Sequence, residues 1–263
     1  MAGDRAAIIE QIQRAVAALV ATQPAGVGLW LVGGFRYRLL DRAVRRSVDI
    51  DYHWEGDLVA KQQELVELFQ RRLMPDIRRH LELEGSVQAA SGSADDAVSV
   101  ASIELAFWRI GSQLGRIEIP VDVTRIECAD RPTARTADGI VYRTASNADM
   151  VESKVIAIVG RTFLEHRDLI DLHLFASHVG PDTPARLQHK LKRLKLERAG
   201  VVRRLADLEH SRAHHARSLD SLIREQVDAP AAATLARAGG GRAILEHLQG
   251  LLATLLAEPG AEE

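Results

Sequence analysis

The sequence predicts an α+β fold, with a mixed β-sheet in the N-terminal part and a helical C-terminal part. In the first half, short apolar segments with strand character alternate with segments whose apolar residues recur at helical spacing. From about residue 146, helical periodicity continues almost to the end of the chain. We therefore expect two domains, residues 1–145 and residues 146–263.

Composition limits the class of protein. The 263 residues are 46% hydrophobic and 27% charged, which is ordinary for a globular protein with a buried core. Because Cys128 is the single cysteine, an intramolecular disulfide and a cysteine-based zinc cluster are excluded. Apolar runs stay well short of the roughly eighteen residues that cross a bilayer, and the N-terminus leads into an amphipathic helix and not a signal peptide. We expect a cytoplasmic protein without membrane contact.

The expected elements of the first half follow from these periodicities. Helical spacing of apolar residues is found at 5–22, 35–46 and 58–83, the last of which Pro75 can interrupt. Strand character is found at 27–32, 47–54, 98–110 and 116–125, the last two joined by a turn at 111–115. Pro120 favours an edge position or a bulge for the last strand.

The second half is expected to be helical after Pro132 and a turn at Asp138-Gly139. Polar residues around Ser146 can cap a helix that runs through residue 158. The other expected helices are 161–178, a very long one over 184–227, and a final region that is broken at 238–241 and ends near residue 256.

Two glycines and two aspartates form the most informative motif. Gly33 and Gly34 close an apolar strand, and Asp49 and Asp51 follow on the next one. Alternate residues of a strand share a face, so the two carboxylates lie side by side. Mg²⁺ selects such oxygen ligands and usually brings a phosphate with it, and a glycine turn lets backbone N–H groups approach that phosphate. The motif predicts Mg²⁺-dependent chemistry on a nucleotide, although isolated D-x-D triplets are also common at solvated strand ends.

A third carboxylate on a neighbouring strand would complete the acidic cluster. In the segment 116–125, Glu118 and Asp122 fall on one face and the apolar residues on the other. The pattern does not separate the two candidates, and both are retained.

A second set of charged residues lies in the helical half. Lys154 and Arg161 are seven residues apart, two turns along one helix face, and Asp168 and Asp171 are three residues apart on the next helix. Such cations can engage a triphosphate, and an acid can orient the lysine or act on an acceptor hydroxyl. Alone, both patterns are more typical of surface ion pairs.

Basic residues concentrate between Arg186 and Arg224, where eleven Lys and Arg stand against four Asp and Glu, a balance of +7. Either a polyanion contact or a solvated helix face explains this excess. The segment also contains His210, His214 and His215, whose spacing can bind zinc. Because no carboxylate or cysteine partner is evident, we expect these histidines to lie on a solvated helix face.

In this order, the motifs resemble those of the AbiEii/AbiGii family of nucleotidyltransferase toxins, a branch of the polymerase-β-like nucleotidyltransferases. The resemblance covers roughly residues 30 to 175. It is carried by the segments 31–34, 47–52, 116–119, 152–161 and 167–172.

The resemblance implies a nucleotidyltransferase core over 1–145 and a helical domain over 146–263 that contributes Lys154 and Asp168 to the active site, together with a basic helix. It implies transfer of a nucleoside monophosphate from an NTP to an acceptor, expected to be RNA and in particular a tRNA end. The implied cofactor is Mg²⁺, with Mn²⁺ as an alternative. The implied partner is an antitoxin, in a toxin–antitoxin or abortive-infection phage-defence system.

The family's roles can be assigned to the matching positions. Gly33 and Gly34 would cradle the phosphates, and Asp49 and Asp51 would bind Mg²⁺. Lys154 would contact the triphosphate, with Arg161 as a further cation, and Asp168 would lie in the active site near Lys154.

The chain departs from the wider superfamily in one respect. Many members have Gly-Ser where this chain has Gly33-Gly34, so a hydroxyl that could contact phosphate is missing. Ser47 can supply such a hydroxyl or can be structural, and both readings stay open. The match over 116–119 favours Glu118 as the third carboxylate, whereas Asp122 keeps the same face.

Three other functions are compatible with parts of the pattern. One is a nucleotidyltransferase that modifies a small molecule such as an aminoglycoside-type antibiotic. The second is a catalytically silent nucleotide-binding or partner-binding protein, against which the intact acids and Lys154 argue. A haloacid-dehalogenase-like phosphohydrolase also uses D-x-D, but its first aspartate lies near the chain start, and it is the least favoured.

Overall fold

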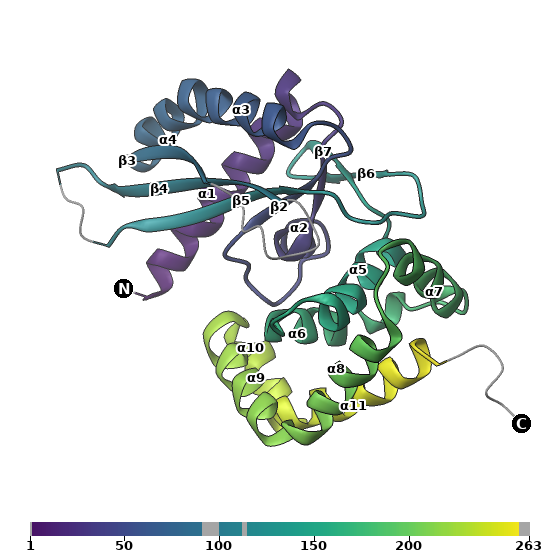
Figure 1. The fold of residues 1–263 in the computed structure, drawn as a ribbon. Helices are drawn as coiled ribbons and strands as arrows, with labels where there is room; N and C mark the ends of the chain where they lie inside the picture. The colour runs from purple at the N-terminus through teal and green to yellow at the C-terminus, as the bar shows by residue number, and fades with distance from the viewer. Residues whose placement is uncertain (1, 91–99, 112–114, 258–263) are drawn as a thin grey trace, which may run out of the picture. The chain divides into compact units, whose positions relative to one another are not determined.

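The structure is a computed structural model that describes residues 2–90, 100–111 and 115–257, and the chain divides into two compact units (Figure 1). The first unit comprises residues 1–43, 47–126 and 132–145, and the second comprises 44–46, 127–131 and 146–263. The expected division at residue 145 leaves the short segments 44–46 and 127–131 in the first domain, whereas the structure assigns them to the second unit.

The described part of the first unit is built on a seven-stranded mixed sheet in the order β3-β4-β5-β2-β1-β7-β6. In its centre, β2 pairs antiparallel with β1 and parallel with β5. The strands are β1 (Trp30–Val32), β2 (Ile50–His53), β3 (Leu83–Ala90), β4 (Val100–Arg109), β5 (Ile117–Thr124), β6 (Thr133–Ala137) and β7 (Ile140–Thr144).

The helices of the first unit pack on this sheet and close its core. Apolar side chains such as Ile12, Leu65 and Phe69 are fully buried in one cluster with the inward face of β5. The opposite face of β5 is exposed at Glu118 and Pro120, so it is free to carry polar chemistry. The helices are α1 (Ala2–Thr22), a 3₁₀ turn (Pro24–Gly26), α2 (Gly33–Leu40), α3 (Leu58–Leu68), a π-helical turn (Phe69–Leu73) and α4 (Met74–Leu81).

Several expected elements of the first unit differ in extent. The helix expected over 35–46 begins at the glycine pair and ends at Leu40, and Arg42 then adopts a positive φ of 55° that no helix accommodates. The interruption expected at Pro75 lies just before that residue, as a π-helical turn (Phe69–Leu73) that leads directly into α4, whose second residue is Pro75. Residues 98–99 and 112–114 of the expected strand pair and its turn lie outside the described residues.

Three strands were not expected from the sequence. The β3 segment pairs along its whole length with β4. The β6–β7 hairpin lies in a region expected to become helical, although its turn at Asp138-Gly139 was recognised. Both turn residues have positive φ, 51° and 76°, as the right-handed twist of a tight hairpin requires.

The second unit is helical, as expected, but its long central helix is divided. The helix expected over 184–227 is broken at Lys195, which has a positive φ of 54°, and again at Ser211. No helix in the described part of the chain is long and apolar enough to span a membrane. The helices are α5 (Asn147–Gly160), α6 (His166–Leu174), a 3₁₀ turn (Ala176–His178), α7 (Thr183–Arg193), α8 (Arg198–His210), α9 (Arg212–Gln226), α10 (Ala229–Arg237) and α11 (Gly240–Leu255).

Helix α11 forms the centre of the second unit. Its apolar stripe, including Leu245, Leu248 and Leu252, is fully buried, and the helix contacts α6, α7, α8 and α9. The sequence left open whether this stripe is core or a partner surface, and the structure shows that it is core.

Candidate active site

One carboxylate of the D-x-D motif lies in a row across the sheet with a carboxylate of the neighbouring strand β5. Asp51 on β2 is paired in parallel register with Asp122 on β5, and Asp122 is paired with Ser102 on β4. Side chains that are directly paired across strands point to the same face, about 5 Å apart. Ser102 Oγ donates a hydrogen bond to Asp122 Oδ1 at 2.6 Å, which orients that carboxylate.

Gly33 lies directly against the carboxylate of Asp51. A Cβ built on Gly33 would lie 1.8 Å from Asp51 Oδ2, and the residue has a positive φ of 72°. Any side chain here would displace Asp51. Gly33 and Gly34 also begin α2. The N-cap residue Val32 has an apolar side chain, which cannot accept hydrogen bonds from the first N–H groups of this helix. A helix N-terminus of this kind favours a bound phosphate.

Asp49 precedes β2 and is held by a buried serine. Ser47 is 6% exposed, and its Oγ donates to Asp49 Oδ1 at 2.6 Å. The Ser47 carbonyl in turn accepts a hydrogen bond from Gln13 of α1. Of the two readings of Ser47, this geometry favours a hydroxyl that positions Asp49.

The two candidates for the third carboxylate occupy different surroundings. Asp122 is half-buried and in register with Asp51. Glu118 lies four residues away on β5, a separation of roughly 13 Å along the strand. Its side chain is 59% exposed and forms an ion pair with Arg116 at 3.1 Å. The register therefore favours Asp122.

The residues near Gly33 have the chemistry that a hard divalent cation prefers. Asp51 and Asp122 are in register, Asp49 lies two residues before Asp51, and Mg²⁺ and Mn²⁺ prefer such carboxylate oxygens over nitrogen or sulfur ligands. The residues present therefore fit the ion that the sequence implied, next to a glycine turn that fits its phosphate.

In the second unit, the remaining predicted residues form a buried charge network. Lys154 Nζ on α5 lies 2.6 Å from Asp168 Oδ1 and 3.0 Å from Asp171 Oδ2 on α6. Burial alone would lower the pKa of Lys154, but the two carboxylates outweigh it and raise that pKa above its ordinary value. Burial likewise opposes ionisation of Asp171, yet Lys154 and Arg45 hold its pKa below the ordinary range.

Arg161 extends this network toward solvent. It is the C-cap residue of α5, and its guanidinium donates to Asp168 Oδ2 at 2.8 Å. The Arg161 side chain is 41% exposed, whereas Lys154 is 12% exposed. The two cations and two acids noted in the sequence thus pair with each other.

Arg45 is the member of the network that the sequence analysis missed. It is 3% exposed and binds Asp171 through two hydrogen bonds, from Nε at 2.6 Å and from a terminal nitrogen at 2.8 Å. In the sequence it was one of several arginines on an expected helix. In the sequence, Arg45 differs from the other arginines of this segment in that it directly follows Ala43-Val44 and so begins a partly apolar, non-helical segment.

Two of the basic residues on α7, Arg186 and Lys190, belong to a second buried charge network. Lys190 Nζ lies 2.6 Å from both Asp149 Oδ1 and Glu152 Oε2. Arg186 donates to Asp130, Asp149 and Glu152, and its hydrogen bonds to Asp130 and Glu152 raise its pKa. These two cations are therefore structural, and a polyanion contact would have to use the others.

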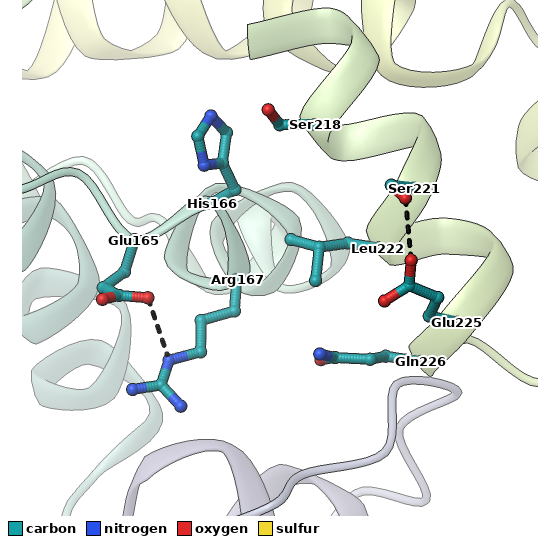
Figure 2. A pocket seen from close by; sticks show the side chains of 8 residues that line it. All are labelled: Glu165, His166, Arg167, Ser218, Ser221, Leu222, Glu225 and Gln226. Atoms are coloured by element: carbon teal, nitrogen blue, oxygen red, sulfur yellow. Dashed lines mark hydrogen bonds and ion pairs between the residues drawn. The ribbon is translucent and has the colours of Figure 1, made fainter.

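A cavity of about 390 Å³ lies between α6 and α9 in the second unit (Figure 2). His166 and Arg167 line it from α6, and Ser218 and Glu225 line it from α9. Among the described residues that line this cavity, none belongs to the predicted active site. The cavity therefore shares no described lining residue with the acidic row.

The family follows from comparison of the whole sequence with known families. The profile of the AbiEii nucleotidyl transferase toxin family, described as a type IV toxin–antitoxin system, matches residues 14–238. This chain belongs to that family. The AbiEii match confirms the resemblance inferred from the motifs, and it makes the chain a nucleotidyltransferase of the toxin type.

Solved structures confirm the fold of this AbiEii chain. JHP933 from Helicobacter pylori matches with a TM-score of 0.54 and 15% identity, covering 95% of this chain and 94% of JHP933. MenT4, a nucleotidyltransferase toxin from Mycobacterium tuberculosis, matches with a TM-score of 0.53 and 19% identity, covering 95% and 88% of the two chains. A search of curated protein sequences gave no match.

Proposed function

We propose that this chain transfers a nucleoside monophosphate from an NTP to the end of an RNA, with a tRNA as the expected acceptor, in a Mg²⁺-dependent reaction that Mn²⁺ can also support. The observation that carries the proposal is the row formed by Asp51 and Asp122 beside Gly33. This row places acidic oxygens next to a helix N-terminus, which is the pairing that a metal–triphosphate substrate needs.

In this reaction an acceptor hydroxyl oxygen attacks the α-phosphorus and forms a new P–O bond. The bond from the α-phosphorus to the oxygen that bridges to the β-phosphorus breaks, pyrophosphate leaves, and the hydroxyl proton passes to solvent. Asp49 and Asp51 would hold the metal, and Asp122 would be the third carboxylate, oriented by Ser102. Bound Mg²⁺ supplies charge neutralisation and lowers the pKa of the attacking hydroxyl. The leading N–H groups of α2 receive the phosphate oxygens, so most of the catalysis is positioning and electrostatics.

The cations of the second unit take different parts in this proposal. Arg161 keeps two-fifths of its side chain exposed and is suited to an anionic substrate. Lys154 is already neutralised by Asp168 and Asp171. We assign Lys154 and Asp168 the task of holding Arg161 in place, in addition to the direct triphosphate contact expected for Lys154 from the resemblance.

Exposed basic side chains on the second unit support an RNA acceptor. They bind phosphates in a sequence-independent and salt-dependent way, which suits a substrate that is recognised by its backbone and shape. They include Lys192, Lys195, Arg203, Arg217 and Arg224.

A labelling assay tests the proposal. The protein is incubated with Mg²⁺ and each α-³²P-labelled NTP, with and without total tRNA. We expect label on RNA with the wild type, and a loss of at least about 100-fold in Asp51→Asn and Asp122→Asn, because losing a metal ligand exceeds the effect of losing an outer-shell partner. Glu118→Gln, on the same strand, is the matched control and should keep near-normal transfer.

The outcomes separate the alternatives. Label on a small molecule instead of RNA would replace the acceptor by an antibiotic-type substrate. An absence of any transfer would favour a catalytically silent protein. If Glu118→Gln abolished transfer and Asp122→Asn did not, the assignment of the third carboxylate would be reversed. As a member of a toxin–antitoxin family, the chain is also expected to be neutralised by a cognate antitoxin.

A further inference from the structure

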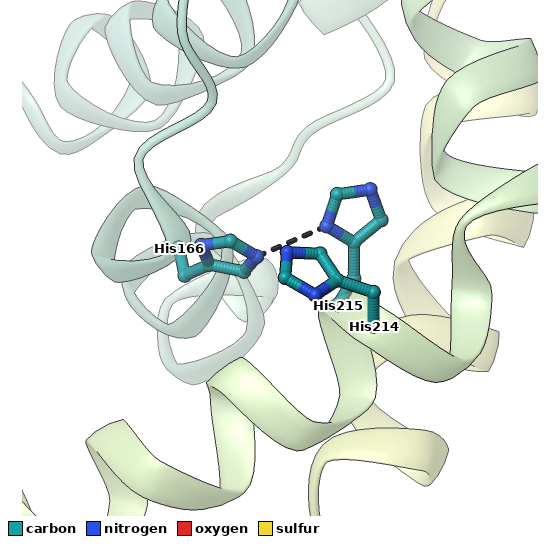
Figure 3. Close-up of side chains that lie close together, drawn as sticks. All are labelled: His166, His214 and His215. Carbon is teal, nitrogen blue, oxygen red and sulfur yellow. Dashed lines mark hydrogen bonds between the residues drawn. The ribbon is translucent and has the colours of Figure 1, made fainter.

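Three histidines gather where α6 and α9 meet in the second unit (Figure 3). His166 is the first residue of α6, and His214 and His215 lie in the first turn of α9. One ring nitrogen from each lies within 4.8 Å of the others. His166 Nε2 and His215 Nδ1 are 3.0 Å apart. The expectation that His214 and His215 lie on a solvated face is therefore wrong for His215, which is 5% exposed.

The surroundings of His166 and His215 favour the neutral imidazole. Burial, together with the neighbouring rings, lowers the pKa of His166 below its ordinary value. Burial also lowers the pKa of His215, although Asp207 opposes this shift. A neutral imidazole has one ring nitrogen with an available lone pair, which is the form that binds a metal ion.

His215 also has the outer partner that metal-binding histidines use. Its Nε2 is buried, makes no hydrogen bond within the described residues, and lies 3.5 Å from Asp207 Oδ2. A carboxylate near Nε2 favours the proton on that nitrogen, which leaves Nδ1 facing the cluster as an acceptor. The sequence did not reveal this partner because Asp207 lies on α8 and His215 on α9.

We propose that His166, His214 and His215 bind a transition-metal ion, with Zn²⁺ as the favoured ion and Asp207 as the residue that orients His215. In a tetrahedral zinc site, Zn–N bonds of about 2.0–2.1 Å place ligand nitrogens roughly 3.3 Å apart. Two of the nitrogens are already 3.0 Å apart, and all three lie within 4.8 Å of one another. Water would take the fourth position.

The position of the site suggests its role. His166 also lines the cavity between α6 and α9, which gives a hydrated ion a route to the ligands (Figure 2). The metal would join the start of α6 to the start of α9. Because α6 also carries Asp168 and Asp171, the metal would stabilise the helix that holds the buried charge network. This inference does not depend on the proposed function, because the ligands here are imidazole nitrogens and not the carboxylates of Asp51 and Asp122.

Metal titration of the full chain tests the site. The protein is freed of metal with a chelator and kept in millimolar Mg²⁺, which occupies carboxylate sites and competes poorly for imidazole. Zn²⁺ is then titrated against a chromophoric chelator, and Co²⁺ is added separately to record its visible absorption. We expect about one Zn²⁺ per chain, a tetrahedral-type Co²⁺ spectrum, and a higher Tm with zinc than without it.

Matched variants decide whether these residues are the ligands. His214 is exposed, so the His214→Ala variant should fold, but it should bind Zn²⁺ at least tenfold more weakly than the wild type. Asp207→Asn should weaken Zn²⁺ binding by roughly 10–100-fold. His210→Ala, an exposed histidine at the end of α8, is the control and should bind as the wild type does. A second histidine pair, His173 and His247, has ring nitrogens 2.9 Å apart, so His247→Ala is a further control.

Three results would overturn the proposal. The first is the absence of zinc binding at micromolar Zn²⁺ in the folded wild type. The second is equal binding by His214→Ala and His210→Ala. The third is a loss of binding in His247→Ala in place of His214→Ala.

Discussion

At the scale of single residues, Gly33 is constrained for two independent reasons. Its φ of 72° lies in the left-handed region, which costs other residues about 1–2 kcal/mol. Its missing side chain leaves the space that Asp51 Oδ2 occupies. The first constraint concerns stability, and the second concerns the position of a predicted metal ligand. Substitutions can separate them.

Gly33→Ala is expected to reduce transfer by roughly 100-fold, because displacing a reacting group by about 1 Å has effects of that size. Gly139→Ala is the control, since Gly139 has a φ of 76° but no atom within 4 Å of an added Cβ. Both variants should lose stability through the left-handed φ, and Gly33→Ala should lose more because its Cβ meets Asp51, as measured by thermal unfolding. Equal transfer rates in the two variants would contradict the role assigned to Gly33.

At the scale of elements, the pair α5 and α6 is held by charges as well as by apolar packing. Lys154 bridges two carboxylates of α6, and Arg45 covers the second of them. Removing one partner of such a buried group leaves an uncompensated charge, which typically costs 3–5 kcal/mol. Removing one member of this network therefore lowers the free energy of unfolding by more than the intact network contributes to it.

Lys154→Ala is expected to destabilise the protein by about 3 kcal/mol, the lower end of that range, because Asp168 and Asp171 lose their shared cation but keep Arg161 and Arg45. Lys192→Ala on the exposed side of α7 should change stability by less than about 0.5 kcal/mol. Chemical denaturation measures both. If Lys154→Ala were as stable as Lys192→Ala but inactive, Lys154 would act on the substrate alone.

The same network predicts how stability depends on pH. The pKa of Asp171 is lowered in the folded state, so the unfolded chain binds the proton more readily. This stability is present above the unfolded pKa of about 3.9 and is lost as the pH falls below it, through the folded pKa. We expect the acid-unfolding midpoint of the wild type to lie below that of Lys154→Ala. Coincident midpoints in a circular-dichroism acid titration would contradict this.

At the scale of the whole molecule, the two units are not consecutive in sequence. Residues 44–46 and 127–131 leave the first unit and belong to the second. They bring Arg45 to Asp171 and Asp130 to Arg186. A division of the chain at residue 145 would therefore remove charged partners from the helical unit.

We expect a fragment of residues 127–263 to unfold at a higher temperature than a fragment of residues 146–263, because the longer one keeps Asp130 beside Arg186. The longer fragment also keeps the backbone N–H groups of Ala129 and Asp130 that donate to Asp149. Thermal unfolding followed by circular dichroism measures the difference. Equal unfolding temperatures would show that the 127–131 segment contributes nothing to this unit.

The sequence by itself determined the α+β class, the family, and the nature of the chemistry. These rest on local signals: the glycine pair, the D-x-D spacing, the helical periodicity and the N-cap at Ser146, whose side chain accepts a hydrogen bond from Asp149. Each depends on neighbours within a few residues, so each can be seen without the fold. The division of the 184–227 segment and the β6–β7 strands were missed because turns and packing outweigh weak helical periodicity.

Only the tertiary structure decided which charged residues meet. The register that pairs Asp51 with Asp122, the closure of Lys154 and Arg161 onto Asp168, and the histidine cluster each join residues on different elements. The physical reason is that strand register and helix docking are set by burial of the whole core, and side-chain charge follows them. A one-residue shift of β5 would have reversed its faces and removed Asp122 from the row.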